Sequence, residues 1–193
     1  RCHVFVREPI VIANLEVVTD TIDKCLKRLG SKTKFVAMAL PSAAVITKKI
    51  TLPAGLRETD MEVQVESEAN QYIPFALEEV NLDFQVIGPS PASPDDVDVL
   101  LAASRKEKVE DRVAAAEAAD LKPVVVDVES YATQAAYELI VAQLPAGAKE
   151  QIITLADIGG AAIKFTMMKG DELLYSREQA FGGGQLTQEI MRA

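Results

Sequence analysis

Short apolar runs alternate with amphipathic helical patterns along this chain, and this alternation limits the fold more than any other feature of the sequence. Apolar positions recur at helical spacing from Val17 to Leu29, and a continuously apolar run follows from Phe35 to Leu40. A run of that length, closed by Pro41, is typical of a buried strand. Since the same change of period recurs downstream, we expect an α/β or α+β protein.

The same patterns place the remaining elements. Three prolines and two adjacent acids predict a hairpin-like surface loop without regular structure from Gly88 to Asp96. The expected helices are Thr59–Tyr72, Lys106–Ala119, Glu129–Leu144 and a last one from Gln185. The expected strands are Val45–Leu52, Leu82–Ile87, Val97–Ala103, Leu121–Val128, Gln151–Ala156, Ala161–Met168 and Glu172–Ala180.

Composition and charge exclude several classes of function. A formal net charge of −9 argues against nucleic-acid binding, which depends on clustered Lys and Arg. No apolar run approaches the roughly 20 residues of a membrane-spanning helix, so direct membrane insertion is not expected. Cys2 and Cys25 are too few for a disulfide framework and indicate a reducing compartment. His3, the only histidine, has no partner pattern for a metal or a catalytic triad.

The residues with the clearest chemical potential form a glycine turn after a strand, Asp157-Ile158-Gly159-Gly160. Backbone N–H groups at such a turn can approach a phosphate because no side chain blocks them. The carboxylate of Asp157 is suited to hold Mg²⁺ through its waters. The alternative is a plain hairpin whose glycines only satisfy the turn.

A second glycine cluster, Gly182-Gly183-Gly184, precedes the last expected helix. The free N–H groups of a helix N-terminus can add to an anion site. The alternative is a strand-to-helix turn that needs glycine for its backbone geometry. Two glycine turns that end strands of one β-meander favour phosphate binding.

Several longer segments are more specific than the glycines. The stretch from Asp157 to Gly183 resembles the second phosphate-binding hairpin of the actin, hexokinase and FtsA superfamily. More narrowly, the segments 43–48, 71–83 and 97–105 are similar to the PilM family, and the resemblance spans roughly residue 10 to the end.

The resemblance implies an actin-like (ribonuclease H-like) α/β fold of FtsA type, partial, with an inserted small α+β domain. Residues 1–42 would then be part of the first actin-like subdomain, and 43–122 the inserted domain. Residues 123–150 would return to the first subdomain, and 151–193 would start the second. Both ends are expected to belong to a longer protein, because the first phosphate hairpin and the adenosine-binding segment of the superfamily are not found in this sequence.

The function implied by the resemblance is that of a scaffold in type IV pilus assembly. PilM proteins are implied to bind ATP with Mg²⁺ and the N-terminal cytoplasmic peptide of PilN, and to link motor ATPases and other platform proteins at the inner face of the bacterial inner membrane. Asp157, Gly159, Gly160, Gly182 and Gly183 carry over as half of a phosphate clamp, with Asp157 at the metal. Half a clamp is expected to bind nucleotide poorly. No catalytic residue is identified, so a slow ATPase is the most that is expected.

Two other functions stay open at the level of sequence: a sugar-kinase-like phosphotransferase of the same superfamily, and an interaction domain whose glycine turns bind nothing. Two surface segments also have two interpretations each. Tyr72-Ile73-Pro74-Phe75 is either a lid over the core or the wall of a peptide groove. Ser104-Arg105 is either a polar loop contact or part of a partner groove.

Overall fold

The computed structural model describes residues 12, 14–141, 143–145, 147–170 and 172–192. The chain forms two compact units, residues 1–126 and 127–193, and each is described by itself. The predictions for Cys2 and His3 lie outside the described residues. The division into four segments predicted above is finer than these two units and stays a prediction.

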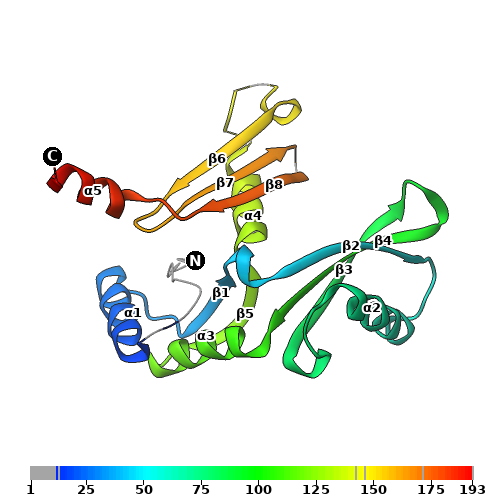
Figure 1. Ribbon diagram of the computed structural model, residues 1–193, viewed down its shortest axis with the longest axis horizontal. Coiled ribbons are helices and arrows are strands. Elements are labelled where there is room, and N and C mark those ends of the chain that lie inside the picture. The colour runs from blue at the N-terminus through cyan, green and yellow to red at the C-terminus, as the bar shows by residue number, and fades with distance from the viewer. Residues whose placement is uncertain (1–11, 13, 142, 146, 171, 193) are drawn as a thin grey trace. The chain divides into compact units, whose positions relative to one another are not determined.

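The first unit contains a two-stranded sheet flanked by two helices that pack on each other (Figure 1). Its strands are β1 (Phe35–Leu40) and β5 (Lys122–Val128, whose last two residues are counted in the second unit), and its helices are α1 (Leu15–Leu29) and α3 (Lys106–Ala118). The side chain of Asn14 accepts a hydrogen bond from the N–H of Val17 at the start of α1, and Gly30 ends the helix at φ 63°. Buried Ile22 of α1 packs against Ala115 of α3 and Ala119 after it.

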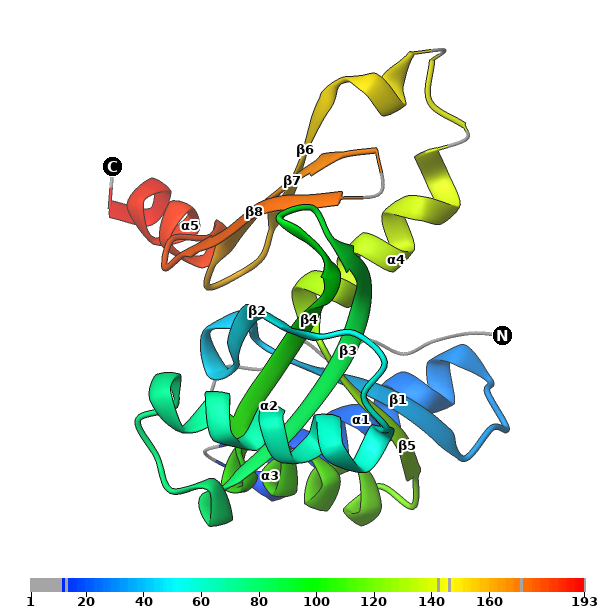
Figure 2. The same cartoon turned by 90° about the vertical axis from the view of Figure 1, so that its right-hand side faces the viewer.

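A three-stranded antiparallel sheet with one covering helix forms the rest of the first unit, in the order β2-β4-β3 (Figure 2). The elements are β2 (Ile46–Pro53), α2 (Glu58–Tyr72), β3 (Val80–Ser90) and β4 (Ser93–Arg105). The inward side chains alternate with outward polar ones, as expected for a half-buried sheet. Its core consists of Ile50, Leu52, Met61, Val65, Val99 and Leu101.

The segment from Gly88 to Asp96 does join two strands as a hairpin, but the prediction that it lacks regular structure is wrong. Strands β3 and β4 continue into it and pair as far as Ser90 with Ser93. The prolines are accommodated because the ladder shifts register between Val86 and Gly88 and again after Pro89, and such irregularities tolerate a missing N–H donor. The turn itself is therefore much shorter than the composition suggested.

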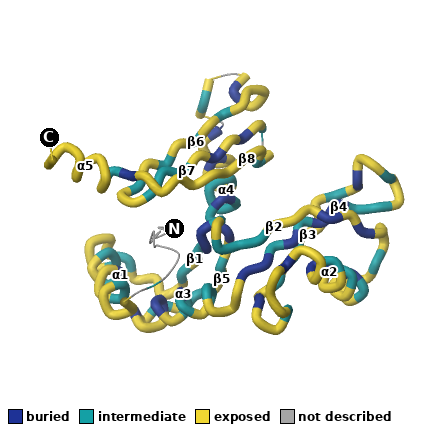
Figure 3. The backbone as a smooth tube through the Cα atoms, viewed as in Figure 1, coloured by how far each residue is buried: buried dark blue, intermediate teal, exposed yellow. Residues whose placement is uncertain are grey.

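The second unit is built on a β-meander, with strands in the order β6-β7-β8 and all neighbours antiparallel. The strands are β6 (Ile152–Ile158), β7 (Ile163–Lys169) and β8 (Glu172–Gln179), and the helices are α4 (Glu129–Val141) and α5 (Gly183–Arg192). Tyr137 and Val141 of α4 pack with Met168 of β7 to form its core. Helix α5 begins two residues earlier than predicted and buries none of its residues (Figure 3).

None of the described helices is long and apolar enough to cross a membrane. The short 3-10 turns at Ser42–Ala44, Leu77–Glu79 and Ala148–Glu150 complete the regular structure of the described residues.

Candidate functional site

The first glycine turn connects β6 to β7 at one end of the meander. Asp157 and Ile158 belong to β6 itself, so the turn begins at Gly159 and not at Asp157. The N–H of Gly159 donates a hydrogen bond to the carbonyl of Ala162 at 2.9 Å, which closes the turn. The strand register places Asp157 directly across from Lys164.

The second glycine turn packs directly on the first. The N–H of Gly183 donates to the carbonyl of Gly159 at 2.9 Å, and the N–H of Gly184 donates to the carbonyl of Gly160 at 2.8 Å. A Cβ atom on Gly182 would lie 2.5 Å from the carbonyl oxygen of Gly160, and one on Gly184 would lie 2.9 Å from it. Glycine at 182 and 184 is therefore required by the close approach of the two turns.

The start of α5 is capped from within the chain. The N–H of Gly182 donates to the side-chain oxygen of Gln185 at 2.7 Å, and the side-chain amide of Gln185 donates to the carbonyl of Ala180 at 3.3 Å. With the bonds between the turns, the amides of Gly182, Gly183 and Gly184 all have protein acceptors. The N–H groups at the start of α5 are thus satisfied by acceptors within the chain itself.

Gly160 differs from the glycines that it supports. Its φ is not in the left-handed region, and a Cβ atom built on it would meet no described atom within 4 Å. Within the described part of the chain, neither its amide nor that of Ala161 donates to a protein acceptor. The packing of the described residues therefore does not require glycine at position 160, and the space beside it is open.

The predicted site residues are therefore brought together as two contacting turns. Asp157 precedes the first turn in strand β6, on the side of the sheet that carries Leu155 and faces α4. Among the described residues, no three His, Cys, Asp or Glu side chains form a group that could hold a metal ion. A role of Asp157 at a metal is thus limited to one protein carboxylate with water completing the coordination.

Sequence reasoning missed the charged residues beside Asp157. Lys164 forms ion pairs with Glu129, the first residue of α4, and with Glu178 of β8. The register of a four-residue turn would have identified Lys164 as the partner of Asp157. Glu129 comes from a segment 35 residues away in sequence and gave no such signal.

A second candidate site lies in the first unit, where α2 ends. The ammonium of Lys48 lies 4.7 Å from the ring centroid of Tyr72, and the guanidinium of Arg105 lies 5.3 Å from that of Phe75. Tyr72 is 42% exposed and Phe75 40% exposed. We call these four residues the aromatic-cation surface. They leave two large apolar rings accessible on a folded domain.

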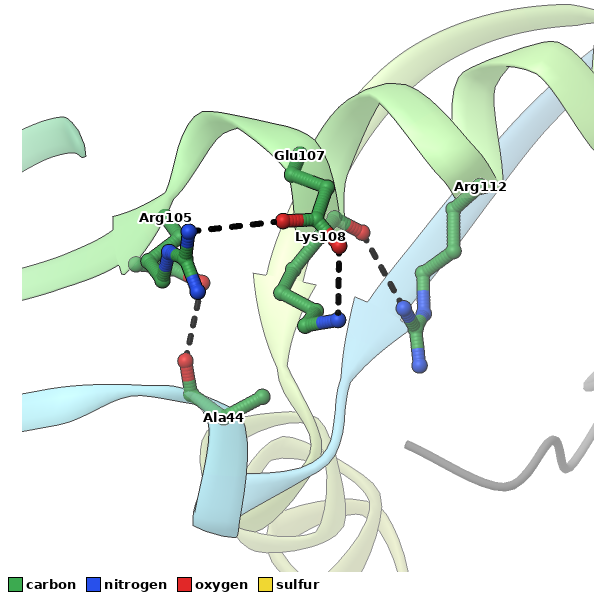
Figure 4. Close-up of polar contacts among 6 residues, drawn as sticks. Ala44, Arg105, Glu107, Lys108 and Arg112 are labelled. Carbon is green, nitrogen blue, oxygen red and sulfur yellow. Dashed lines mark hydrogen bonds and ion pairs between the residues drawn. The ribbon is translucent and has the colours of Figure 1, made fainter. Parts of the chain in front are cut away.

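The position of Arg105 is fixed by the junction between β4 and α3 (Figure 4). The hydroxyl of the preceding residue, Ser104, donates to the carbonyl of Ala44 at 2.8 Å. The guanidinium of Arg105 is paired with Glu107 at 3.5 Å, and Glu107 also contacts Lys108 at 3.2 Å. Ser104 thus has a structural role, whereas Arg105 presents its side chain at the surface.

Known structures resemble this chain over nearly its whole length. The solved structure titled as a PilM-PilN type IV pilus biogenesis complex matches with a TM-score of 0.73 and 28% identity, covering 97% of this chain and 56% of that one. The cytoplasmic domain of EpsL, an inner-membrane component of the type II secretion system of Vibrio cholerae, matches with a TM-score of 0.54 and 12% identity, covering 94% of this chain and 62% of that one.

These likenesses confirm the predicted actin-like α/β fold class for the part of the fold that the chain spans. The chain spans less than two thirds of the length of either structure. The sugar-kinase alternative finds no support among them. The family model described as type IV pilus assembly protein PilM matches residues 6–193, so the chain belongs to the PilM family.

Proposed function

We propose that this chain is the core of a nucleotide-dependent adaptor in type IV pilus assembly, which binds Mg·ATP at the paired glycine turns and a PilN peptide at the aromatic-cation surface. The observation that carries the proposal is the contact of the two turns, which leaves Gly160 open while Gly182 and Gly184 are fixed by packing. Membership of the PilM family supports the cellular context.

The residues present fit a phosphate group, but the residues that would donate hydrogen bonds to it differ from the predicted ones. The amides of Gly160 and Ala161 are the donors that a phosphate would find, while Gly159, Gly182 and Gly183 hold the turn in shape. Asp157 would hold the Mg²⁺ through water. When bound, Mg²⁺ would offset part of the charge of the phosphates and link them to Asp157.

An adaptor is a better interpretation than an enzyme. No catalytic residue is assigned to this chain, and any ATP hydrolysis is expected to be slow. The solved PilM-PilN complex supports PilN as the partner. We extend the proposal to a location at the inner face of the bacterial inner membrane, and to contacts with motor ATPases and other platform proteins.

The nucleotide part of the proposal is tested by calorimetry with Mg·ATP on two forms. One form is residues 1–193, and the other is the complete protein, including any residues that its gene encodes on either side of them. We expect clear binding by the complete protein and weaker binding by residues 1–193. The nucleotide part is abandoned if neither form releases heat with Mg·ATP and both are folded by circular dichroism.

The partner part is tested by retention on an immobilised peptide with the N-terminal sequence of PilN. Phe75→Ala is expected to reduce retention of the complete protein by roughly tenfold, because an aromatic side chain often anchors such an interface. Phe35→Ala is a matched control, since Phe35 is 62% exposed and also lies under a cation, Lys122, at 5.9 Å. Equal retention of both variants would place the peptide elsewhere.

A further inference from the structure

A row of alternating charge crosses the β-meander beside the first glycine turn. In the strand register, Asp157 of β6 lies directly opposite Lys164 of β7, and Lys164 lies directly opposite Glu178 of β8. Directly opposed residues on one face of a sheet have Cβ atoms about 4.5–5.5 Å apart. The three side chains therefore form an acid-base-acid row on the face of the sheet that packs against α4.

A third carboxylate approaches the same lysine from α4. Glu129 opens that helix, where a negative charge is favoured by the helix dipole, and its side chain forms an ion pair with the ammonium of Lys164. The ammonium also lies 3.3 Å from the carboxylate of Glu178. The side chain of Lys164 is 26% exposed, so it is largely held inside this cluster but still reached by solvent.

The row lies at the glycine-turn end of the sheet. Only the pair Ile158–Ile163 separates Asp157 and Lys164 from the turn. On this face of the three strands, Lys164 is the one cation among the described residues, because Arg177 pairs with Phe165 on the opposite face and Lys169 ends the strand. Any anion drawn to this end of the sheet meets a cluster of three carboxylates and one ammonium.

We propose that Lys164 sets the affinity of the paired glycine turns for phosphate, and that Glu129 and Glu178 restrain it. This inference rests on the proposed nucleotide site and names the residue whose charge would set the affinity of that site. With the ammonium present, the cluster has a formal charge of −2; without it, the charge is −3 and repels Mg·ATP more strongly, because Mg·ATP is still a net anion when Mg²⁺ is counted. Neutralising Glu178 has the opposite effect, since it removes a repelling charge and one of the carboxylates that hold the ammonium.

The two charge changes give results of opposite sign, which a purely structural ion pair does not. In calorimetry of the complete protein with Mg·ATP, Lys164→Met is expected to weaken binding by roughly tenfold, as a unit charge within about 10 Å of a ligand does in partly buried surroundings. Glu178→Gln is expected to tighten binding by roughly threefold to tenfold. Lys164→Arg keeps the charge and is expected to bind within about threefold of wild type.

Matched controls lie at the other ends of the same strands. Lys169→Met in β7 and Glu172→Gln in β8 make the same chemical changes away from the row, and both are expected to leave Mg·ATP affinity unchanged. Thermal unfolding of every variant separates a loss of affinity from a loss of folded protein.

Two results would overturn the inference while wild type still binds. If Lys164→Met and Glu178→Gln both weaken binding, the ion pair acts only by holding β7 and β8 together. If Lys164→Met binds as wild type does, the lysine does not act on the ligand. If wild type itself fails to bind Mg·ATP, both the proposed nucleotide site and this inference are wrong. That result can be told apart from the other two because it is seen without any variant.

Discussion

Gly160 and Gly182 share a residue type and a turn contact, yet the structure gives them different reasons to be glycine. Gly182→Ala places a methyl group 2.5 Å from the carbonyl oxygen of Gly160, so we expect a loss of about 1–3 kcal/mol of stability. Gly160→Ala has room and no left-handed φ, so its stability is expected to stay within about 1 kcal/mol of wild type.

The same two substitutions separate an effect on ligand binding from an effect on stability. Gly160→Ala is expected to weaken Mg·ATP binding by tenfold or more, because its methyl group fills the space left for the phosphate. Denaturant unfolding and calorimetry measure the two effects separately. A Gly160→Ala variant that is stable and binds Mg·ATP normally would remove this turn from the proposed site.

Asp98 predicts a pH dependence for the first unit. Its buried carboxylate contacts Lys49 at 2.6 Å and accepts a hydrogen bond from Thr51 at 3.2 Å. The hydrogen bond from Lys49 is the main cause that holds the pKa of Asp98 below its ordinary value, against the opposing effect of burial. A lowered pKa in the folded state means that ionised Asp98 stabilises the fold above the unfolded-state pKa of about 3.9.

That stabilisation is lost as the pH falls through the lowered pKa. We therefore expect Asp98→Asn to unfold at a lower temperature than wild type at pH 7, with the gap closing below about pH 4. Thermal unfolding between pH 2 and pH 7 measures this gap. Asp95→Asn, at an exposed position of the same strand, is the control, and a gap for Asp98→Asn that is constant with pH would contradict the assignment.

At the scale of elements, the end of α1 and the strand cores followed from local chemistry, whereas the end of α4, which lies at Val141 and not at Leu144, and the charged clusters did not. Helix α1 ends at Leu29, as the following Gly30 predicted. The hairpin of β3 and β4 was expected, but its loop was predicted too long, because prolines were taken to exclude strand residues that a shifted register accommodates. The glycines that form the two contacting turns were singled out from sequence, but the Glu129–Lys164 pair depends on tertiary packing that no local pattern encodes.

The end of α1 offers a direct test of this local chemistry. Gly30 has φ 63°, and no described atom lies within 4 Å of a Cβ atom built there, so backbone strain alone should decide the cost of a side chain. Gly30→Ala is expected to lower the free energy of unfolding by about 1 kcal/mol. Urea unfolding measures the change. Equal stability of Gly30→Ala and wild type would mean that the C-terminal turn of α1 adds little to the unit.

At the scale of the whole molecule, the chain separates its two proposed sites between its two units. The paired glycine turns lie in residues 127–193, and the aromatic-cation surface lies in residues 1–126. A nucleotide-dependent adaptor requires that occupation of one site changes the affinity of the other. Binding of each ligand alone would show two sites but not an adaptor that responds to nucleotide.

We therefore expect Mg·ATP to raise the affinity of the complete protein for the PilN peptide by at least about fivefold, within the usual range of coupling between sites. Linkage then requires the peptide to raise the affinity for Mg·ATP by the same factor, because both paths lead to one ternary complex. Calorimetry in both orders measures the two factors, with Phe75→Ala as a variant that should lose the peptide effect and keep nucleotide binding. If both factors equal one, the chain binds its ligands independently, and the peptide contact is a constant attachment that nucleotide does not regulate.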